Sequence, residues 1–292
     1  MTAVKIAAVQ MTCGPKADAN IAKAEAFVRE AAGQGARIVM LQELFANLYF
    51  PQAMKHERYA LAQPAEGHPM LARFQALAAE LGVVLPVPFY ERAGNALFNS
   101  VMVIDADGRR AGVYRKSHIP HAPGYEEKYY FSPGDTGFQV WPTRYGTLGV
   151  GICWDQWFPE AARAMAMKGA DLLVYPTAIG ADPSGQEPDS SGAWQRVMQG
   201  HAAANAIHVM AANRIGREDD EGSAIDFYGS SFIADHTGAK LAEAGTREGV
   251  ILAEADFDRA RAHRERWSFF RDRRPDLYGV LMGLDGRTRP AA

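Results

Sequence analysis

Residues 148–155 read LGVGICWD, an apolar run that ends in the thiol of Cys153. Residues 156–160 (QWFPE) and an alanine-rich stretch follow. This order predicts a buried strand over 148–152, a sharp turn and a helix over 158–168. A thiol on such a turn faces the mouth of the sheet, and the helix N-terminus beside it favours the nucleophilic thiolate. The alternative is a small apolar filler, since free cysteines are often simply buried.

Similar units lie on both sides of this run. Residues 35–40 (GARIVM) and 169–174 (GADLLV) each follow an alanine-rich helix and enter a buried strand, which suggests two similar β–α–β halves. Residues 105–108 (DADG) predict a hairpin turn. No low-complexity linker divides the chain, so we expect one α/β domain over residues 1–292, with a mixed sheet system covered by helices. The predicted helices span 20–32, 69–81, 158–168 and 194–206, and the predicted strands 4–11, 36–41, 83–90, 100–104, 111–114, 148–152, 171–175, 207–211, 230–234 and 250–255.

Composition narrows the class of protein. Hydrophobic residues make up 48% and charged residues 22% of 292 residues, as in soluble globular proteins. The formal net charge of −3 gives no sign of a nucleic-acid or membrane-surface partner. Cys13 and Cys153 make no disulfide framework, and free thiols fit a reducing cytoplasm. The N-terminus has no signal-peptide pattern, so we expect a cytoplasmic protein.

Three reactive side chains follow predicted strands. Glu43 ends one buried strand, Lys116 follows another, and Cys153 ends a third. Ligand sites in α/β proteins gather at the carboxyl ends of strands. A carboxylate base, a cation and a thiol suffice for acyl transfer, because the base takes the thiol proton, the thiolate attacks a carbonyl carbon and the cation stabilises the oxyanion. The alternative for Lys116 is an ordinary exposed strand end.

Three sequence blocks carry a resemblance to a known family. The blocks are QEL at 42–44, YRK at 114–116 and GICWD at 151–155. In this order they resemble the nitrilase-like carbon–nitrogen hydrolases, over nearly the whole chain. The resemblance implies a four-layer α-β-β-α sandwich without a metal or organic cofactor. It also implies Glu43 as general base, Lys116 as oxyanion stabiliser and Cys153 as nucleophile.

The resemblance implies two further catalytic groups. The family carries another glutamate between the lysine and cysteine blocks, and residues 124–134 read GYEEKYYFSPG. The spacing to the Pro-Gly pair favours Glu127 over the adjacent Glu126. The backbone N–H of Trp154 would line the oxyanion hole.

Three further stretches of sequence indicate the class of substrate. Residues 153–163, 194–202 and 227–233 resemble family members that hydrolyse the ureido end of a cationic N-carbamoyl amine, releasing a diamine, CO2 and ammonia. Asp182 matches the glutamate that binds the distal ammonium there, with a carboxylate one methylene shorter. Residues 179–189 are acidic and irregular, which also fits an ammonium. Trp157 and Trp194 are expected to wall the pocket, although tryptophans also serve as core packing.

Other functions remain open at this stage. The runner-up is an N-carbamoyl-amino-acid amidase or an aliphatic amidase, although Gln156 and Trp157 offer no cation to a substrate carboxylate. A catalytically silent binding subunit would not need all three reactive residues. His118 and His121 alone make a poor metal site.

Two expectations concern the surface. Residues 219–221 (DDE) are expected to be a solvated loop. The large apolar side chains of the C-terminal tail, residues 265–292, include six that need cover. The family resemblance implies that such tails pair across a subunit interface, so we expect a homo-oligomer, a dimer or a multiple of dimers. The six side chains are Trp267, Phe269, Phe270, Leu277, Tyr278 and Leu281.

Overall fold

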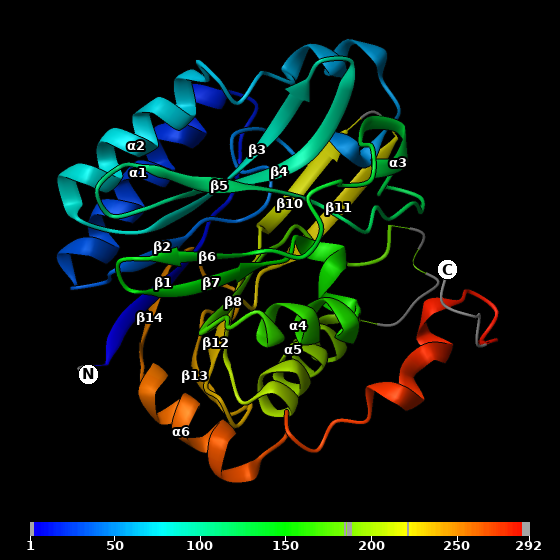
Figure 1. The fold of residues 1–292 in the computed structure, drawn as a ribbon. Helices are drawn as coiled ribbons and strands as arrows, with labels where there is room; N and C mark the ends of the chain where they lie inside the picture. The colour runs from blue at the N-terminus through cyan, green and yellow to red at the C-terminus, as the bar shows by residue number, and fades with distance from the viewer. Residues whose placement is uncertain (1–2, 184, 186–188, 221, 288–292) are drawn as a thin grey trace.

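Two β-sheets lie face to face, and a pair of helices covers the outer face of each one (Figure 1). The computed structural model describes residues 3–183, 185, 189–220 and 222–287. The first sheet joins β14 (Gly249–Ala255), β1 (Val4–Gln10) and β2 (Ile38–Met40) to β3 (Leu85–Ala93), β4 (Ala96–Ile104) and β5 (Arg110–Arg115). The link from β2 toward β3 is made by the Val39 N–H, which donates to the Val84 carbonyl oxygen at 3.0 Å, and by the Val84 N–H, which donates to that of Arg37 at 2.8 Å.

The second sheet has the order β13 (Lys240–Glu243), β12 (Phe232–Ala234), β9 (His208–Ala212), β8 (Leu172–Pro176), β7 (Gly146–Val150) and β6 (Val140–Thr143). Strands β7, β8 and β9 run parallel. A separate antiparallel ribbon joins β10 (Ile215–Asp220) to β11 (Ser223–Tyr228). The helices are α1 (Ala17–Gly33), α2 (Pro69–Leu81), α3 (Glu127–Tyr130), α4 (Pro159–Met167), α5 (Ser191–Asn205) and α6 (Phe257–Trp267), and the 3-10 helices are η1 (Phe50–Gln52), η2 (His56–Leu61), η3 (Cys153–Trp157) and η4 (Pro275–Met282).

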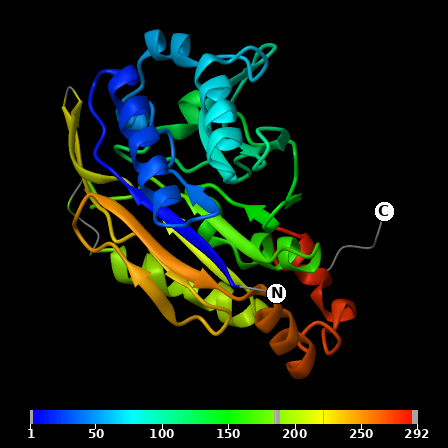
Figure 2. The same ribbon diagram turned by 90° about the vertical axis from the view of Figure 1, so that its left-hand side faces the viewer.

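Alternating side chains on the strands make the layers. In β1, Ile6 and Ala8 pack between the two sheets, whereas Ala7 and Val9 face the layer of α1 and α2. Strand side chains point to opposite faces in turn, so an uninterrupted apolar strand is buried on both faces. Figure 2 shows α1 and α2 side by side on this outer face.

The second sheet repeats the arrangement. In β8, Leu172 and Val174 face the first sheet, whereas Leu173 and Tyr175 pack against α4 and α5. The layer order is therefore α-β-β-α, and the predicted four-layer sandwich is confirmed.

Most predicted elements lie within a few residues of the observed ones. The predicted helix over 69–81 has the bounds of α2, and the turn at 105–108 joins the paired strands β4 and β5. The sequence missed β6, β10, β11, β13 and α6. The prediction of a solvated loop at 219–221 was wrong for Asp219 and Asp220, because these two residues are the last of β10. The Asp220 carboxylate contacts Lys55 Nζ at 2.9 Å and Arg58 Nη2 at 2.5 Å. Glu221 lies outside the described residues.

No helix within the described ranges has both the length and the apolar character that a membrane crossing requires.

Candidate active site

The three reactive residues lie just beyond three strand ends. Glu43 follows β2 and Lys116 follows β5, both in the first sheet, whereas Cys153 follows β7 in the second. The two sheets pack face to face, so their strand ends bring side chains far apart in sequence to one place. The site therefore depends on how the two sheets are packed together, and neither sheet alone contains it.

Lys116 lies between two carboxylates. Its Nζ is 2.8 Å from Glu43 Oε1 and 2.6 Å from Glu127 Oε2, and all three residues are fully buried. Glu127 is the first residue of α3. The adjacent Glu126 instead contacts His121 Nδ1 at 3.1 Å. The structure thus brings Glu127, and not Glu126, to the lysine.

Further hydrogen bonds fix both carboxylates. Asn99 Nδ2 donates to Glu43 Oε1 at 2.7 Å, and the Tyr49 hydroxyl donates to Glu127 Oε1 at 2.7 Å. Glu43 Oε2 is buried and has no hydrogen-bond partner among the described residues. A buried acceptor without a donor is rare in folded proteins. This oxygen is therefore available to take a proton from a neighbouring group.

The lysine stays charged in this environment. Burial opposes its charged form, but the charges of Glu127 and Glu43 outweigh that effect, so the pKa of Lys116 lies above its ordinary value. Burial raises the pKa of Glu127 to about 7, and Lys116 opposes that rise. The cluster thus presents a fixed ammonium at neutral pH, as stabilisation of an oxyanion requires.

Cys153 occupies a strained turn at the start of η3. Its φ of 42° lies in the left-handed region, which a non-glycine residue adopts only when the surrounding structure enforces it. Its Sγ lies 3.9 Å from the carbonyl oxygen of Ala178. Gly151 allows the turn to close, because a Cβ there would lie 2.8 Å from the Tyr175 ring.

The resting thiol is protonated, contrary to the expectation from sequence. Burial raises the pKa of Cys153 well above its ordinary value, the charge of Glu43 raises it further, and Lys116 acts in the opposite direction. The expected thiolate at a helix N-terminus was wrong, because η3 is a 3-10 helix of five residues and α4 begins only at Pro159. The nucleophile therefore needs a base to remove its proton.

Asp155 ties the cysteine turn to the lysine strand. Its Oδ2 accepts the Ile152 N–H and the Tyr114 hydroxyl, both at 2.8 Å. Its Oδ1 accepts the backbone N–H of His118 at 3.0 Å, and His118 Nδ1 lies 2.7 Å away. Since Tyr114 and His118 flank Lys116, this buried carboxylate sets the distance between Cys153 and the ammonium.

A cavity of about 420 Å³ opens above the thiol. Cys153 and Glu127 lie in its wall, as do Trp154 and Trp157, and Asp182 and Asp189 belong to the same wall. Cys153 and two acidic residues thus line one cavity, whose volume is in the range of small-molecule sites.

Trp194 does not reach this cavity. It is fully buried behind the wall, where its indole N–H donates to Gln156 Oε1 at 2.7 Å, and it packs with the core of α5. It supports the wall, whereas Trp157 lines the cavity. Glu187 of the acidic segment lies outside the described residues.

Sequence reasoning missed Tyr49, Asn99 and Asp155. The contacts of Tyr49 and Asn99 with the two glutamates span 78 and 56 residues, so no local pattern signals them. Asp155 had a signal, since it directly follows Cys153 and Trp154 in a block that the family resemblance already used.

Comparison with known proteins shows which family this chain is similar to. The carbon-nitrogen hydrolase family model matches residues 5–265. The chain is 55% identical to N-carbamoylputrescine amidase of Solanum lycopersicum over 97% of this chain and 96% of that protein. It is 50% identical to citrullinase of Francisella tularensis, over 97% of this chain and 99% of that protein.

A solved structure has the same fold. The carbon–nitrogen hydrolase of Helicobacter pylori G27 superposes with a TM-score of 0.91 at 38% identity, over 96% of this chain and 99% of that one. The family expected from three sequence blocks is confirmed: the chain belongs to the carbon–nitrogen hydrolases of the nitrilase superfamily.

Proposed function

We propose that the protein hydrolyses N-carbamoylputrescine to putrescine, CO2 and ammonia. The observation that carries the proposal is one cavity that both Cys153 and Asp182 line. The thiol suits attack on a ureido carbonyl, and the carboxylate suits the ammonium at the other end of the substrate. The amidases that share 53–55% of their residues with this chain support the assignment.

The proposed chemistry uses one acyl-enzyme. Glu43 removes the thiol proton through Oε2, and the sulfur attacks the ureido carbon. Lys116 and the Trp154 backbone N–H stabilise the oxyanion, and ammonia leaves with the proton that Glu43 returns. Water, deprotonated by the same carboxylate, then attacks the carbamoylated cysteine. Glu43 returns the proton to the Cys153 sulfur, and the released carbamic acid transfers its own proton to nitrogen as CO2 leaves, which gives the free amine. Glu127 holds Lys116 in place during both steps.

The alternatives fit the cavity less well. A carbamoyl amino acid carries a carboxylate, yet none of the described residues that line the cavity is a lysine or an arginine. A silent binding subunit does not need the complete arrangement of base, cation and nucleophile. His118 and His121 contact Asp155 and Glu126 respectively, and these contacts account for both side chains without a metal.

We also propose a cellular compartment for the protein and a division of its chain into domains. The free thiols of Cys13 and Cys153 support a reducing cytoplasm. We take residues 1–292 as one hydrolase domain whose tail, residues 265–292, lies at a subunit interface; of these, 288–292 lie outside the described residues.

Replacement of the nucleophile tests the reaction. Cys153→Ala is expected to lower kcat by at least about 10⁴-fold with an unchanged circular dichroism spectrum, because no acyl-enzyme can form. Mass spectrometry of the wild type with a slow substrate should place the adduct on Cys153. An adduct on Cys13, or full activity of the alanine variant, would contradict the assignment.

Replacement of the proposed anchor tests the substrate. A charge-assisted hydrogen bond contributes about 1.5–3 kcal/mol, so Asp182→Asn should lower kcat/KM for N-carbamoylputrescine by about one to two powers of ten. An uncharged N-carbamoyl alkylamine of the same length should lose little. Steady-state kinetics on this substrate pair, with citrulline and N-carbamoyl-β-alanine as further competitors, measures the difference.

Asp189→Asn is the matched variant for that experiment. Asp189 lines the same cavity, but its two oxygens accept the backbone N–H and the hydroxyl of Ser191 at 2.9 and 2.8 Å at the start of α5. Its loss should lower thermal stability and affect both substrates alike. Equal losses on the two substrates for Asp182→Asn would remove the proposed ammonium contact.

The exposed tail predicts an oligomer. Trp267, Leu277 and Leu281 are each about 60% exposed, and Met282 is 84% exposed, whereas Phe270 packs back on the core. Apolar side chains exposed in a row need cover from a second copy. Light scattering should give a multiple of 31.9 kDa, and Leu281→Glu should shift the mass toward the monomer. A monomer mass for the wild type would refute the interface.

A further inference from the structure

The segment that carries the proposed base has an unusual set of partners. Residues 43–49 connect β2 to η1 as a series of turns, with Glu43 at one end and Tyr49 at the other. Both ends reach the catalytic cluster, since Glu43 contacts Lys116 and Tyr49 contacts Glu127. A buried segment outside helices and sheets must find other partners for its backbone carbonyls.

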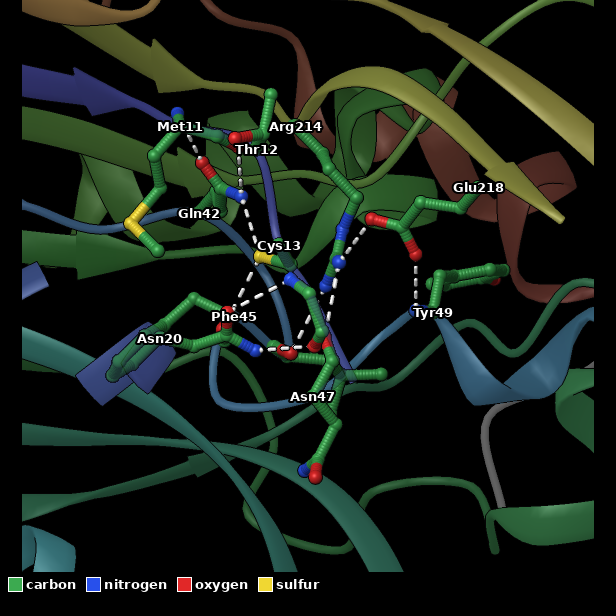
Figure 3. Close-up of polar contacts among 12 residues, drawn as sticks. Met11, Thr12, Cys13, Asn20, Gln42, Phe45, Asn47, Tyr49, Arg214 and Glu218 are labelled. Carbon is green, nitrogen blue, oxygen red and sulfur yellow. Dashed lines mark hydrogen bonds and ion pairs between the residues drawn. The ribbon is translucent and has the colours of Figure 1, made fainter. Parts of the chain in front are cut away.

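One guanidinium supplies most of these partners. Arg214 lies between β9 and β10, and its Nη2 donates to the carbonyl oxygens of Glu43 and Leu44 at 3.1 and 2.9 Å. Its Nη1 donates to the carbonyl oxygen of Asn47 at 3.0 Å (Figure 3). One fully buried side chain thus holds three carbonyls of the segment.

Two other side chains complete the set. Cys13 Sγ lies 3.2 Å from the carbonyl oxygen of Phe45, and Asn20 Nδ2 lies 3.1 Å from that of Ala46 (Figure 3). Together with the bonds from Arg214, five successive carbonyls, 43 to 47, each accept a hydrogen bond from a side chain. The shape of the segment is therefore set from outside, by residues distant in sequence.

The segment needs this restraint. Leu44 has a φ of 49°, in the left-handed region that costs a side-chain-bearing residue roughly 1–2 kcal/mol, and Leu44 directly follows Glu43. If the guanidinium were lost, the turn could relax and the Glu43 carboxylate would move. Misplacement of a reacting group by about 1 Å can cost about 10²-fold in rate.

Glu218 contacts both Arg214 and the segment at residues 43–49. Its Oε1 lies 2.6 Å from Arg214 Nη1, and its Oε2 accepts the backbone N–H of Tyr49 at 2.6 Å. A buried ion pair is weak evidence for a role in fold stability, because apolar replacements are often equally stable. The contacts of this pair instead converge on the two ends of the catalytic segment.

Asn213, the residue before Arg214, forms hydrogen bonds with the chain on the Cys153 side of the site. Asn213 accepts the N–H of Ile179 at 3.0 Å and donates to the Ile179 carbonyl oxygen at 2.9 Å. Ile179 follows Ala178, whose carbonyl oxygen faces Cys153 Sγ. Two consecutive residues after β9 therefore hold the base segment on one side and the nucleophile wall on the other.

We propose that Arg214, together with Glu218, is a positioning residue that holds the Glu43 segment in register with Cys153. The inference rests on the catalytic roles proposed above for Glu43 and Cys153. It concerns the proton transfers that Glu43 carries out in both steps, so its loss lowers kcat and leaves KM nearly unchanged.

Arg214→Lys keeps the charge, but its single nitrogen has three donors for the four acceptors that the guanidinium binds, the three carbonyls and the Glu218 carboxylate. We expect it to lower kcat for N-carbamoylputrescine by about 10- to 100-fold with KM within about threefold of wild type. Glu218→Gln keeps an acceptor for the Tyr49 N–H and removes the charge opposite Arg214, and its kcat should fall about 10-fold. If Arg214→Lys does not fold, Glu218→Gln carries the same test.

Arg264→Lys is the matched control. Arg264 Nε and Nη2 donate to the carbonyl oxygens of Asn205 and Ala206, both at 3.1 Å, away from the cavity. This variant also loses a guanidinium that holds successive carbonyls. It should lose thermal stability and keep the wild-type kcat.

A double-mutant cycle separates positioning from a general loss of structure. If Arg214 acts through Glu43, adding Arg214→Lys to Glu43→Gln should cost nothing further in the rate of acyl-enzyme formation, followed by mass spectrometry in single turnover. Arg264→Lys added to Glu43→Gln serves as the reference. Independent losses that multiply would overturn the inference.

The outcomes distinguish this inference from the proposed function. If Glu43→Gln itself has the wild-type rate, the proposed base is wrong. If Glu43→Gln is slow while folded Arg214→Lys and Glu218→Gln match Arg264→Lys in kcat, the base stands and the positioning role is refuted.

Discussion

The buried contact of the Lys116 ammonium with the carboxylates of Glu43 and Glu127 is the constraint on which this structure depends. Three charged groups without exposure to solvent are costly unless each one has partners at hydrogen-bond distance. Asn99 and Tyr49 provide those partners, and they leave one oxygen of Glu43 without a donor among the described residues. Among the four oxygens of these two carboxylates, Glu43 Oε2 alone has no donor within the described residues, and it is the atom that the proposed reaction uses.

Two other buried charged residues, Asp155 and Arg214, connect the catalytic residues to the chain around the two sheets. Asp155 binds the turn after β7 to the chain on both sides of Lys116, so it relates the nucleophile to the cation. Arg214 binds the turns after β2, so it relates the base to the chain between β9 and β10. The catalytic atoms lie on turns, and these carboxylate and guanidinium contacts give the turns the rigidity that strands and helices have from their own backbone hydrogen bonds.

The sequence predicts features that a local pattern signals, and it does not predict contacts between residues far apart in the chain. Glu43, Lys116 and Cys153 each follow a strand within a recognisable block, so both the sandwich and the reactive residues were accessible, and the sandwich is confirmed. Arg214 contacts Leu44 across 170 positions, and no local pattern carries such a pairing. Strand β10 has the sequence IGREDD, and its charged residues are not typical of a strand. Glu218 within it is nevertheless buried. The thiol pKa was misjudged because burial and the charge of Glu43 outweigh a short 3-10 turn.

A crystal structure of Cys153→Ala with bound N-carbamoylputrescine would show whether base, cation and nucleophile surround the ureido group, because the variant retains substrate. We expect the ureido oxygen within about 3 Å of Lys116 Nζ and the Trp154 backbone nitrogen, with its carbon next to Cβ of residue 153. The distal ammonium is expected at the Asp182 carboxylate. A substrate bound in the reverse orientation, or a ureido group held away from Lys116, would contradict this arrangement.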